Sequence, residues 1–346
     1  MRRTTSIGWA PIAALALALH AGPGAALEKT KVVIGAATTG TFVSYPLALA
    51  DKLGYFKAEG LDAEIVTFAG GTKAVQGLMG GTADYNVGLY EYTIRLQPQN
   101  QYLVSVFNQI LYPGFAVGVR KPLADKVKTL KDLKGLKVGV TAPGSGTQTM
   151  VQYLASKEGV KLEDIAYVPV GSGGTALAAL QHGEIDALSN LDPLMTAAET
   201  QGLLTVIADF RNKAGTEKYF HGSAGSLGLV ARADTVERNP QTTQAVVNAM
   251  MRAVLWIRTH SPEELAKALP AEYGQNDMPL WLASYKNVIG SLAPDGLMPP
   301  DAAQNTYQYI AESTPEVRSA KIDVGRTYTN KFVEQSPVFK QLRGLK

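Results

Sequence analysis

The chain has 346 residues, of which 46% are apolar and 18% charged, and it contains no cysteine. The length predicts two domains or one two-lobed unit with a sizeable core, and the absence of cysteine excludes disulfides, thiolate nucleophiles and Cys-ligated metals. The formal charge of +3 falls to +1 without Arg2 and Arg3, which is too near neutral to indicate a nucleic-acid or polybasic membrane binder.

Residues 1–26 have the pattern of a signal peptide. Arg2 and Arg3 precede the apolar stretch 12–21, and the small residues Gly24 and Ala26 suit cleavage after Ala26. The apolar stretch is too short to span a bilayer comfortably, so we expect export rather than a membrane anchor. With no cysteine available for lipidation, the expected location is the periplasm.

The next segment alternates short β-rich runs with helical patterns. A helix over 41–60 carries Leu47, Ala50 and Leu53 on one face, and Gly54 and Gly60 are predicted to end it in two steps. A second helix starts after Gly70. Because strands and helices alternate, the pattern predicts a mainly parallel sheet flanked by helices, with strands over 31–36, 63–68 and 83–88.

The same series of elements recurs about a hundred residues later. Lys31 matches Lys137, Gly40 matches Gly146 and Thr41 matches Thr147, each 106 residues apart. The second series has predicted strands over 137–140, 165–170 and 185–190. The chain therefore holds two similar α/β lobes, and 226–234 is predicted to return from the second lobe to the first.

Each lobe places two glycine-containing loops directly after strands, at 38–41 and 69–72 and at 142–147 and 171–175. In an open α/β sheet, loops at the carboxyl ends of the strands form the ligand crevice. Glycine lets a ligand approach the backbone, and helix N-termini favour an anion. The alternative for each hydroxyl residue is an ordinary helix cap. The candidate binding residues are Thr39, Gly40, Thr41, Phe42, Gly70, Gly71, Thr72, Ser145, Gly146, Thr147, Ser172, Gly173 and Gly174.

Residues at the ends of the third strand of each lobe are further candidates. Asn190 and Asp192 could hydrogen-bond the ligand or the hinge, and Tyr90 and Glu91 hold the equivalent place in the first lobe. Glu91 could bind a ligand amine or a nearby backbone group, and Lys73 could pair with an anion or remain solvated. Aromatic residues near the loops could surround an apolar ligand body: Phe42, Tyr45, Phe68, Tyr90, Tyr112, Phe115, Phe220 and His221.

The last third of the chain is predicted to be mostly helical. A helix starts at 239–240 with an Asn-Pro signal, and Ser261, Pro262 and Glu264 form a capping-box pattern for the next one. A further helix is predicted over 299–314.

Several of these stretches are similar to the nitrate/sulfonate/taurine-type periplasmic solute-binding proteins of ABC importers. They are "YPLALADKLGYFKAEGLDAEIV" (45–66), "GGTKAVQGLMGGTADYNV" (70–87), and, in the same order, 130–148, 177–188 and 234–249. The resemblance implies the two-lobed type II fold of periplasmic binding proteins, with 27–117 and 226–346 in lobe 1 and 118–225 in lobe 2. It also implies hinges near 115–120 and 222–228 that close on the ligand.

The family implies a monomer that binds a small organic anion, such as a sulfonate, a taurine-like compound or an aromatic carboxylate, and delivers it to permease and ATPase subunits. A periplasmic sensor would share the fold and the site. An enzyme is not expected, because HExxH, HxxxH, GxSxG and P-loop patterns are absent, as is the cysteine motif of the family's pyrimidine-synthesising branch. No metal and no cofactor are expected.

Overall fold

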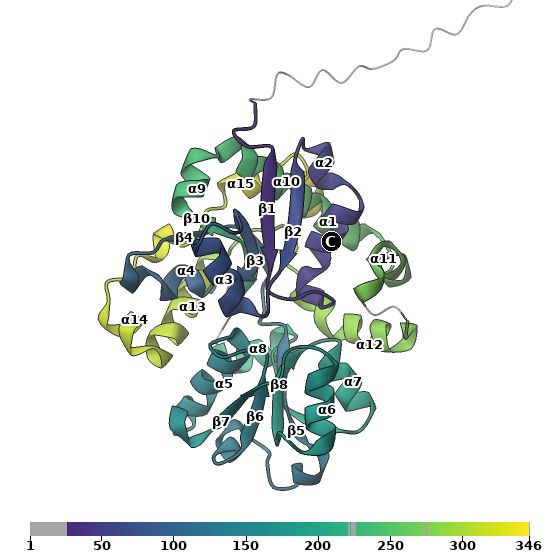
Figure 1. The fold of residues 1–346 in the computed structure, drawn as a ribbon, viewed down its shortest axis with the longest axis vertical. Helices are drawn as coiled ribbons and strands as arrows, with labels where there is room; N and C mark the ends of the chain where they lie inside the picture. Colours follow the sequence, from purple (N-terminus) through teal and green to yellow (C-terminus); the bar gives the residue numbers. More distant parts are fainter. Residues whose placement is uncertain (1–25, 221, 223–225, 274–275, 346) are drawn as a thin grey trace, which may run out of the picture.

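A computed structural model describes residues 26–220, 222, 226–273 and 276–345, and the predicted signal peptide lies outside this range except for Ala26. The described chain forms two lobes stacked along the long axis of the molecule (Figure 1). Each lobe is built on one five-stranded sheet. Within the described ranges, no helix combines the length and the hydrophobicity needed to cross a membrane.

The first lobe has the strand order β2-β1-β3-β10-β4. β1 pairs in parallel with β2 and β3, whereas β10 runs antiparallel between β3 and β4. The two-lobed α/β fold with mainly parallel sheets is thereby confirmed. The strands are β1 (Lys31–Ala36), β2 (Asp62–Thr67), β3 (Tyr85–Leu89), β4 (Leu103–Ile110) and β10 (Leu227–Arg232).

The second lobe repeats this order position by position as β7-β6-β8-β5-β9. β6 pairs in parallel with β7 and β8, and β5 runs antiparallel between β8 and β9. In both lobes the antiparallel strand is the segment by which the chain enters from the other lobe, so the sequence repeat is a structural repeat. The strands are β5 (Phe115–Arg120), β6 (Lys137–Val140), β7 (Ala166–Pro169), β8 (Ala187–Leu191) and β9 (Leu204–Asp209).

Helices cover both faces of the first sheet. The predicted helix over 41–60 is broken as expected, because Gly54 and Gly60 adopt positive φ angles of 69° and 82°. Its parts pack with α10 on one face, and α3 and α4 cover the other. The elements are η1 (Phe42–Ser44), α1 (Tyr45–Lys52), α2 (Tyr55–Ala58), α3 (Gly71–Met79), α4 (Tyr92–Arg95) and α10 (Pro240–Thr259).

The second lobe and the C-terminal segment supply the remaining helices. The capping box at Ser261 is confirmed, since its hydroxyl accepts from the Glu264 N–H and the Glu264 carboxylate accepts from the Ser261 N–H. These helices are α5 (Gly146–Lys157), α6 (Gly174–His182), α7 (Leu194–Thr200), α8 (Lys213–Phe220), α9 (Ala233–Arg238), α11 (Pro262–Ala268), α12 (Met278–Val288), α13 (Pro300–Ser313), α14 (Pro315–Ser319), α15 (Lys331–Glu334) and α16 (Phe339–Gly344).

The chain first passes between the lobes at 111–114, where Gly114 has φ 76°. The predicted hinge at 115–120 coincides instead with β5, which is paired with strands on both sides, so the predicted lobe boundary at 117 falls inside a strand of the second sheet. The return connection runs from the end of β9 to β10 through α8. Part of the predicted second hinge, 223–225, lies outside the described residues, as does His221.

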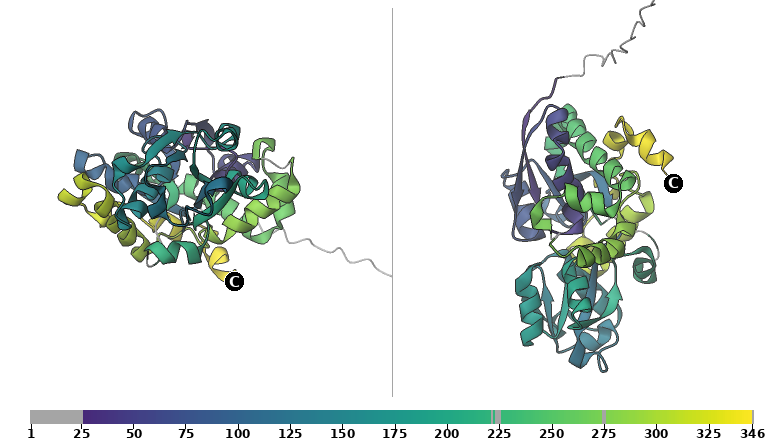
Figure 2. Two further views of the ribbon diagram at one scale, coloured as in Figure 1. Left: turned by 90° about the horizontal axis from the view of Figure 1, so that it is seen from below. Right: turned by 90° about the vertical axis from the view of Figure 1, so that its right-hand side faces the viewer.

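The C-terminal helices contact both lobes. Tyr309 on α13 packs against Tyr153 on α5, with ring centroids 5.3 Å apart. Asn287 on α12 donates from Nδ2 to the Thr196 hydroxyl on α7 at 2.9 Å. Figure 2 shows this green and yellow segment against the first lobe and the waist, leaving the far end of the second lobe uncovered. These helices therefore brace the two lobes against each other.

Gly228 in β10 gives a direct test of the first sheet. A Cβ at this position would lie 2.1 Å from the carbonyl oxygen of Phe107 in β4, and the next nearest atoms are also β4 backbone, which cannot rotate away as a side chain could. We expect Gly228→Ala to lower the free energy of unfolding by about 2–3 kcal/mol. Urea unfolding measures the loss, and Gly290→Ala is the control because its Cβ would meet nothing within 4 Å. Equal stability of the two variants would contradict the strand packing.

Candidate functional site

Three of the glycine-containing loops meet between the lobes and border a cavity of about 60 Å³. They follow β1, β2 and β6, and the ends of β3 and β8 complete the wall. Its lining residues are Ala37, Thr38, Val43, Gly70, Gly71, Leu89, Pro113, Phe115, Thr141, Ser145, Gly146, Thr147, Leu191 and Leu227.

The two lobes touch at the rim of this cavity. The Thr72 hydroxyl donates to the carbonyl oxygen of Pro143 at 3.0 Å, and the Tyr92 hydroxyl lies 3.5 Å from the carbonyl oxygen of Gly144. Thr72 and Tyr92 belong to the first lobe, and Pro143 and Gly144 to the second. The structure therefore describes a closed arrangement of the lobes.

The start of α5 forms a cluster of hydroxyl groups on the second lobe's side. The Thr147 Oγ1 accepts from the Thr141 N–H at 3.0 Å and lies 3.0 Å from the Thr141 Oγ1 and 2.9 Å from the Ser145 Oγ. The first N–H groups of a helix have no partner inside the helix, and its N-terminus is electropositive. This corner therefore offers N–H and O–H donors to an acceptor.

The start of α3 borders the same cavity from the first lobe. Gly70 has φ 93°, and a Cβ there would lie 3.0 Å from the Cβ of Ala142 in the second lobe. Glycine is required here both by the backbone conformation and by the closeness of the other lobe. The N-termini of α3 and α5 thus converge on one cavity from opposite lobes.

Five of the predicted binding residues line the cavity: Gly70, Gly71, Ser145, Gly146 and Thr147. In the loop at 38–41, the residue that lines the cavity is Thr38 and not the predicted Thr41. Thr41 is buried and its Oγ1 lies 2.9 Å from that of Thr38, which lines the cavity in its place. Thr39 is exposed, and Thr39, Gly40, Phe42 and Thr72 lie outside the lining.

The fourth predicted loop does not reach the cavity. Gly173 and Gly174 are exposed, and a Cβ at either would meet nothing within 4 Å. Ser172 is likewise absent from the lining. The buried Asn190 donates from Nδ2 to the carbonyl oxygen of Gly171 at 2.8 Å and so holds this loop in position.

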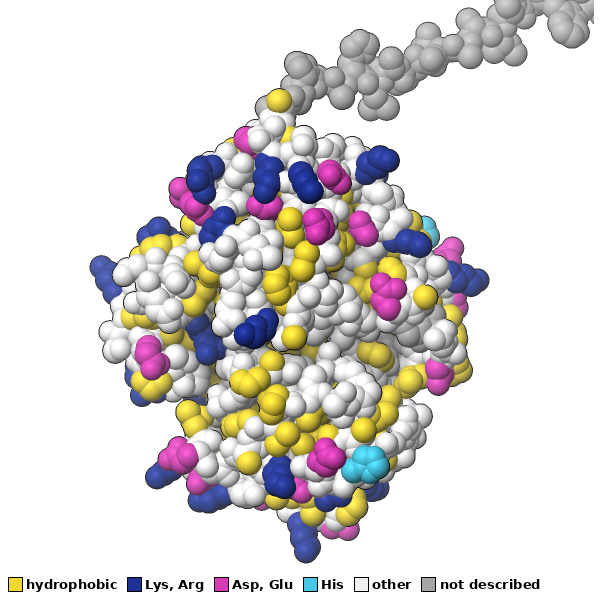
Figure 3. Space-filling view, in the orientation of Figure 1, with side chains coloured by type: hydrophobic (Ala, Val, Ile, Leu, Met, Phe, Trp, Pro, Cys, Tyr) yellow, Lys and Arg dark blue, Asp and Glu magenta, His cyan; other side chains and the backbone are white. Residues whose placement is uncertain are grey.

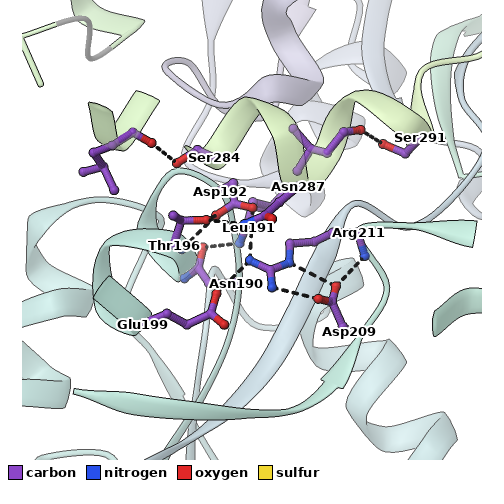
Figure 4. Close-up of polar contacts among 12 residues, drawn as sticks. Asn190, Leu191, Asp192, Thr196, Glu199, Asp209, Arg211, Ser284, Asn287 and Ser291 are labelled. Atoms are coloured by element: carbon purple, nitrogen blue, oxygen red, sulfur yellow. Dashed lines mark hydrogen bonds and ion pairs between the residues drawn. The ribbon is translucent and has the colours of Figure 1, made fainter. Parts of the chain in front are cut away.

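Asp192 is part of a buried ionic network around Arg211 (Figure 4). Its carboxylate accepts from the N–H and the hydroxyl of Thr196 at 2.8 and 2.6 Å and from Arg211 at 3.2 Å. Arg211 also pairs with Asp209 at 2.7 Å and Glu199 at 3.0 Å. Burial disfavours the charged guanidinium, but the hydrogen bond to Asp209 and the three negative charges raise the pKa of Arg211. Asp192 therefore ties α7 to the end of β9, and Thr196 extends the network to Asn287 of the first lobe.

Glu91 joins three elements at the back of the site. Its carboxylate accepts from Arg95 at 3.0 Å, from Tyr309 at 2.6 Å and from Thr149 at 3.4 Å. Burial, together with the charge of Glu91, raises the pKa of Tyr309 well above its usual value. Neighbouring Tyr90 is fully buried and its hydroxyl bonds to Thr327. Glu91 borders a small annex that shares Leu89, Pro113, Phe115 and Gly146 with the main cavity.

Every lining side chain among the described residues is uncharged. Lys73 is exposed on α3 and does not border the cavity. Figure 3 shows the same trend on one face of the molecule, where charged side chains gather toward the far ends of the lobes and are sparser at the waist. Donors at this site are therefore backbone N–H and hydroxyl groups.

Sequence reasoning missed eight lining residues, and most of them are apolar: Ala37, Thr38, Val43, Leu89, Pro113, Thr141, Leu191 and Leu227. Leu89 and Leu191 are the last residues of equivalent strands β3 and β8, so the repeat could have identified them. Phe115 was among the candidate aromatic residues and does line the cavity, whereas Phe42, Tyr45, Tyr90, Tyr112 and Phe220 are buried outside its lining.

Comparisons with known proteins agree with this architecture. A solved protein of Bordetella bronchiseptica RB50 is 38% identical with a TM-score of 0.86, covering 90% of this chain and 98% of that one. The alkanesulfonate-binding protein SsuA of Xanthomonas axonopodis pv. citri, solved with MOPS, is 17% identical with a TM-score of 0.68, covering 88% and 99%. The putative binding protein YtlA of Bacillus subtilis is 23% identical over 250 residues, 72% of each chain.

The sequence model described as NMT1/THI5 like matches residues 41–264, which span most of both lobes. This match covers more than half of the chain, and it includes the cavity-bordering loops at 69–72 and 142–147. The protein therefore belongs to the NMT1/THI5-like family.

Proposed function

We propose that the protein is the periplasmic binding component of an ABC importer and captures a small organic anion between its lobes. The observation that carries this proposal is the convergence of two helix N-termini, those of α3 and α5, on one cavity between the lobes. Helix N-termini stabilise negative charge. A related protein of the same fold is an alkanesulfonate-binding protein, which supports the same ligand chemistry.

Binding proceeds by closure of the lobes around the ligand. In an open form, the N-termini of α3 and α5 separate and each lobe presents its donors to water. An anion that bridges both sets of donors stabilises the closed form over the open one, and its differential affinity sets how far the equilibrium shifts. The closed form, with Thr72 against Pro143 at the rim, is the species we expect the permease to accept.

The apolar part of the lining favours an organic ligand over a bare inorganic ion. Leu89, Phe115, Leu191 and Leu227 can cover a hydrocarbon body while the acid group lies near the hydroxyl cluster of α5. Alkanesulfonates and carboxylates both have this shape. Several charge-assisted hydrogen bonds of about 1.5–3 kcal/mol each would support micromolar affinity after ordering costs.

Thr147→Val tests the placement of the acid group. Losing one hydrogen bond to a charged ligand should weaken binding about tenfold or more. Isothermal titration calorimetry with a series of alkanesulfonates and carboxylates provides the measurement, and the ligand should be recovered unchanged.

Thr147→Ser keeps the hydroxyl and should bind normally. Thr41→Val should change affinity less, because the Thr41 hydroxyl faces Thr38. Binding of none of the anions, or equal affinity of the Thr147→Val variant and the wild type, would count against the proposal.

A further inference from the structure

The uncharged side chains that line the cavity indicate which anions the site accepts. We propose that the site selects anions with an uncharged body and excludes those that also carry an amine, such as ω-amino sulfonates and amino acids. This inference rests on the proposed function, because it specifies the ligand of that same cavity.

The first support is the chemistry of the lining. Its side chains are apolar or hydroxyl-bearing, and among the described residues no carboxylate borders the main cavity. An ammonium group that enters a buried site loses its hydration, and this loss is severe unless an opposite charge replaces the water. The hydroxyls of Thr141, Ser145 and Thr147 already bond to one another, and neutral hydroxyls cannot neutralise the added charge.

The second support is the state of the nearest acid, Glu91 in the annex. One carboxylate oxygen accepts from Tyr309, and the other accepts from Arg95 and Thr149. The Glu91 side chain is only 4% exposed, and Arg95 already neutralises it. A ligand amine would have to displace Arg95 from this carboxylate, which would leave a partly buried guanidinium without its partner.

The third support is the field of the two helices. The N-termini of α3 and α5 both face the cavity, and their partial positive charges attract an anion and repel a cation. The cavity is small, so an amine two carbons from an acid group remains near both helix ends. The same feature that holds the acid group therefore disfavours the amine.

Isosteric ligand pairs test the inference. Propane-1-sulfonate and taurine differ only by a methyl in place of an ammonium group, and butyrate and β-alanine form the matching carboxylate pair. We expect the amine of either pair to bind at least about 100-fold more weakly to the wild-type protein, as measured by calorimetry.

A charge placed in the cavity should relax this selection. Leu191 is partly exposed and lines the cavity, so Leu191→Asp would add a carboxylate, and Leu191→Asn is the uncharged control of matching size. The Asp variant should reduce the ratio of the dissociation constants for taurine and propane-1-sulfonate about tenfold. The Asn variant should leave this ratio nearly unchanged.

The outcomes separate this inference from the proposed function. If taurine binds the wild-type protein as tightly as propane-1-sulfonate does, the proposed exclusion of amines is wrong, but the proposed anion-binding function stands. Failure of both pairs, and of longer alkyl and aromatic sulfonates, would overturn the proposed function and the selection together. The wild-type comparison decides the matter even if the Leu191 variants do not fold.

Discussion

Replacing Arg211 by methionine should lower the free energy of unfolding by about 3–5 kcal/mol, because the change leaves a buried carboxylate without its cation. The Arg211 side chain is only 4% exposed and that of Asp192 only 1%. Asp209 and Glu199 can turn toward water after the change, but Asp192 cannot. Thermal and urea unfolding measure the loss, and Arg238→Met, which removes an exposed ion pair with Asp234, should cost less than about 0.5 kcal/mol.

The pH dependence of the Arg211→Met variant distinguishes a charge effect from lost packing. Burial already raises the pKa of Asp192 with Arg211 in place, and removing the guanidinium should raise this pKa further. A carboxyl group whose pKa is higher in the folded state contributes most stability below its unfolded value of about 4, and the contribution is lost as the pH rises through the folded value. The difference in the free energy of unfolding between the wild type and the Arg211→Met variant should therefore become smaller as the pH is lowered.

The double variant Arg211→Met/Asp192→Asn removes both charges and should recover most of the lost stability at neutral pH. If the loss in the free energy of unfolding is the same at every pH and in the double variant, Arg211 acts through packing alone.

Gly146→Val should weaken anion binding about 30-fold or more and leave the stability of the protein nearly unchanged. A Cβ at Gly146 would lie 2.5 Å from the Leu89 Cδ1, which belongs to the other lobe. Either Leu89, which lines the cavity, must rotate away from the new side chain, or the lobes must stay apart. Overpacking of this kind costs about 1–3 kcal/mol, and here it acts on the closed state alone. Calorimetry gives the affinity and small-angle scattering gives the separation of the lobes.

Two further variants control this prediction. Gly174→Val makes the same change at the first residue of α6, where a Cβ meets nothing within 4 Å, and should bind normally. Adding Leu89→Ala to Gly146→Val removes the atoms that clash and should recover much of the affinity. If the Gly174 variant loses as much affinity as the Gly146 variant, the cavity is not where the ligand binds.

The local patterns of the sequence predicted the two-lobed plan, most of the longer helices and the strands β1, β2, β3, β6, β7 and β8, but not β4, β5 and β9. The repeat that relates Lys31 to Lys137 and Thr41 to Thr147 corresponds to β1 and β6 and to the helices that follow them. The breaks at Gly54 and Gly60 and the capping box at Ser261 were predicted because each depends on a few neighbouring residues. These features follow from backbone conformation and hydrophobic periodicity, which operate over one or two turns of chain.

Local sequence patterns could not predict which residues line the cavity. Thr38 and Thr41 lie in one loop, yet only Thr38 borders the cavity, because the local turn directs Thr41 inward. Equivalent loops in the repeat also diverge. The loop at 142–147 borders the cavity, whereas the loop at 171–175 does not. The pairing of Arg211 with Asp192 likewise joins segments that have no shared sequence pattern.

The sequence alone determined the strands that pair in parallel within each lobe, most of the longer helices and the existence of two similar lobes, since those properties depend on short-range geometry and on the alternation of apolar residues. Only the tertiary structure decided which loop residues face the cavity, which charges are paired, and that 115–120 is a strand of the second lobe and not a hinge. Those outcomes depend on the angle at which the lobes meet and on contacts between residues far apart in the chain, and no local pattern encodes either of them.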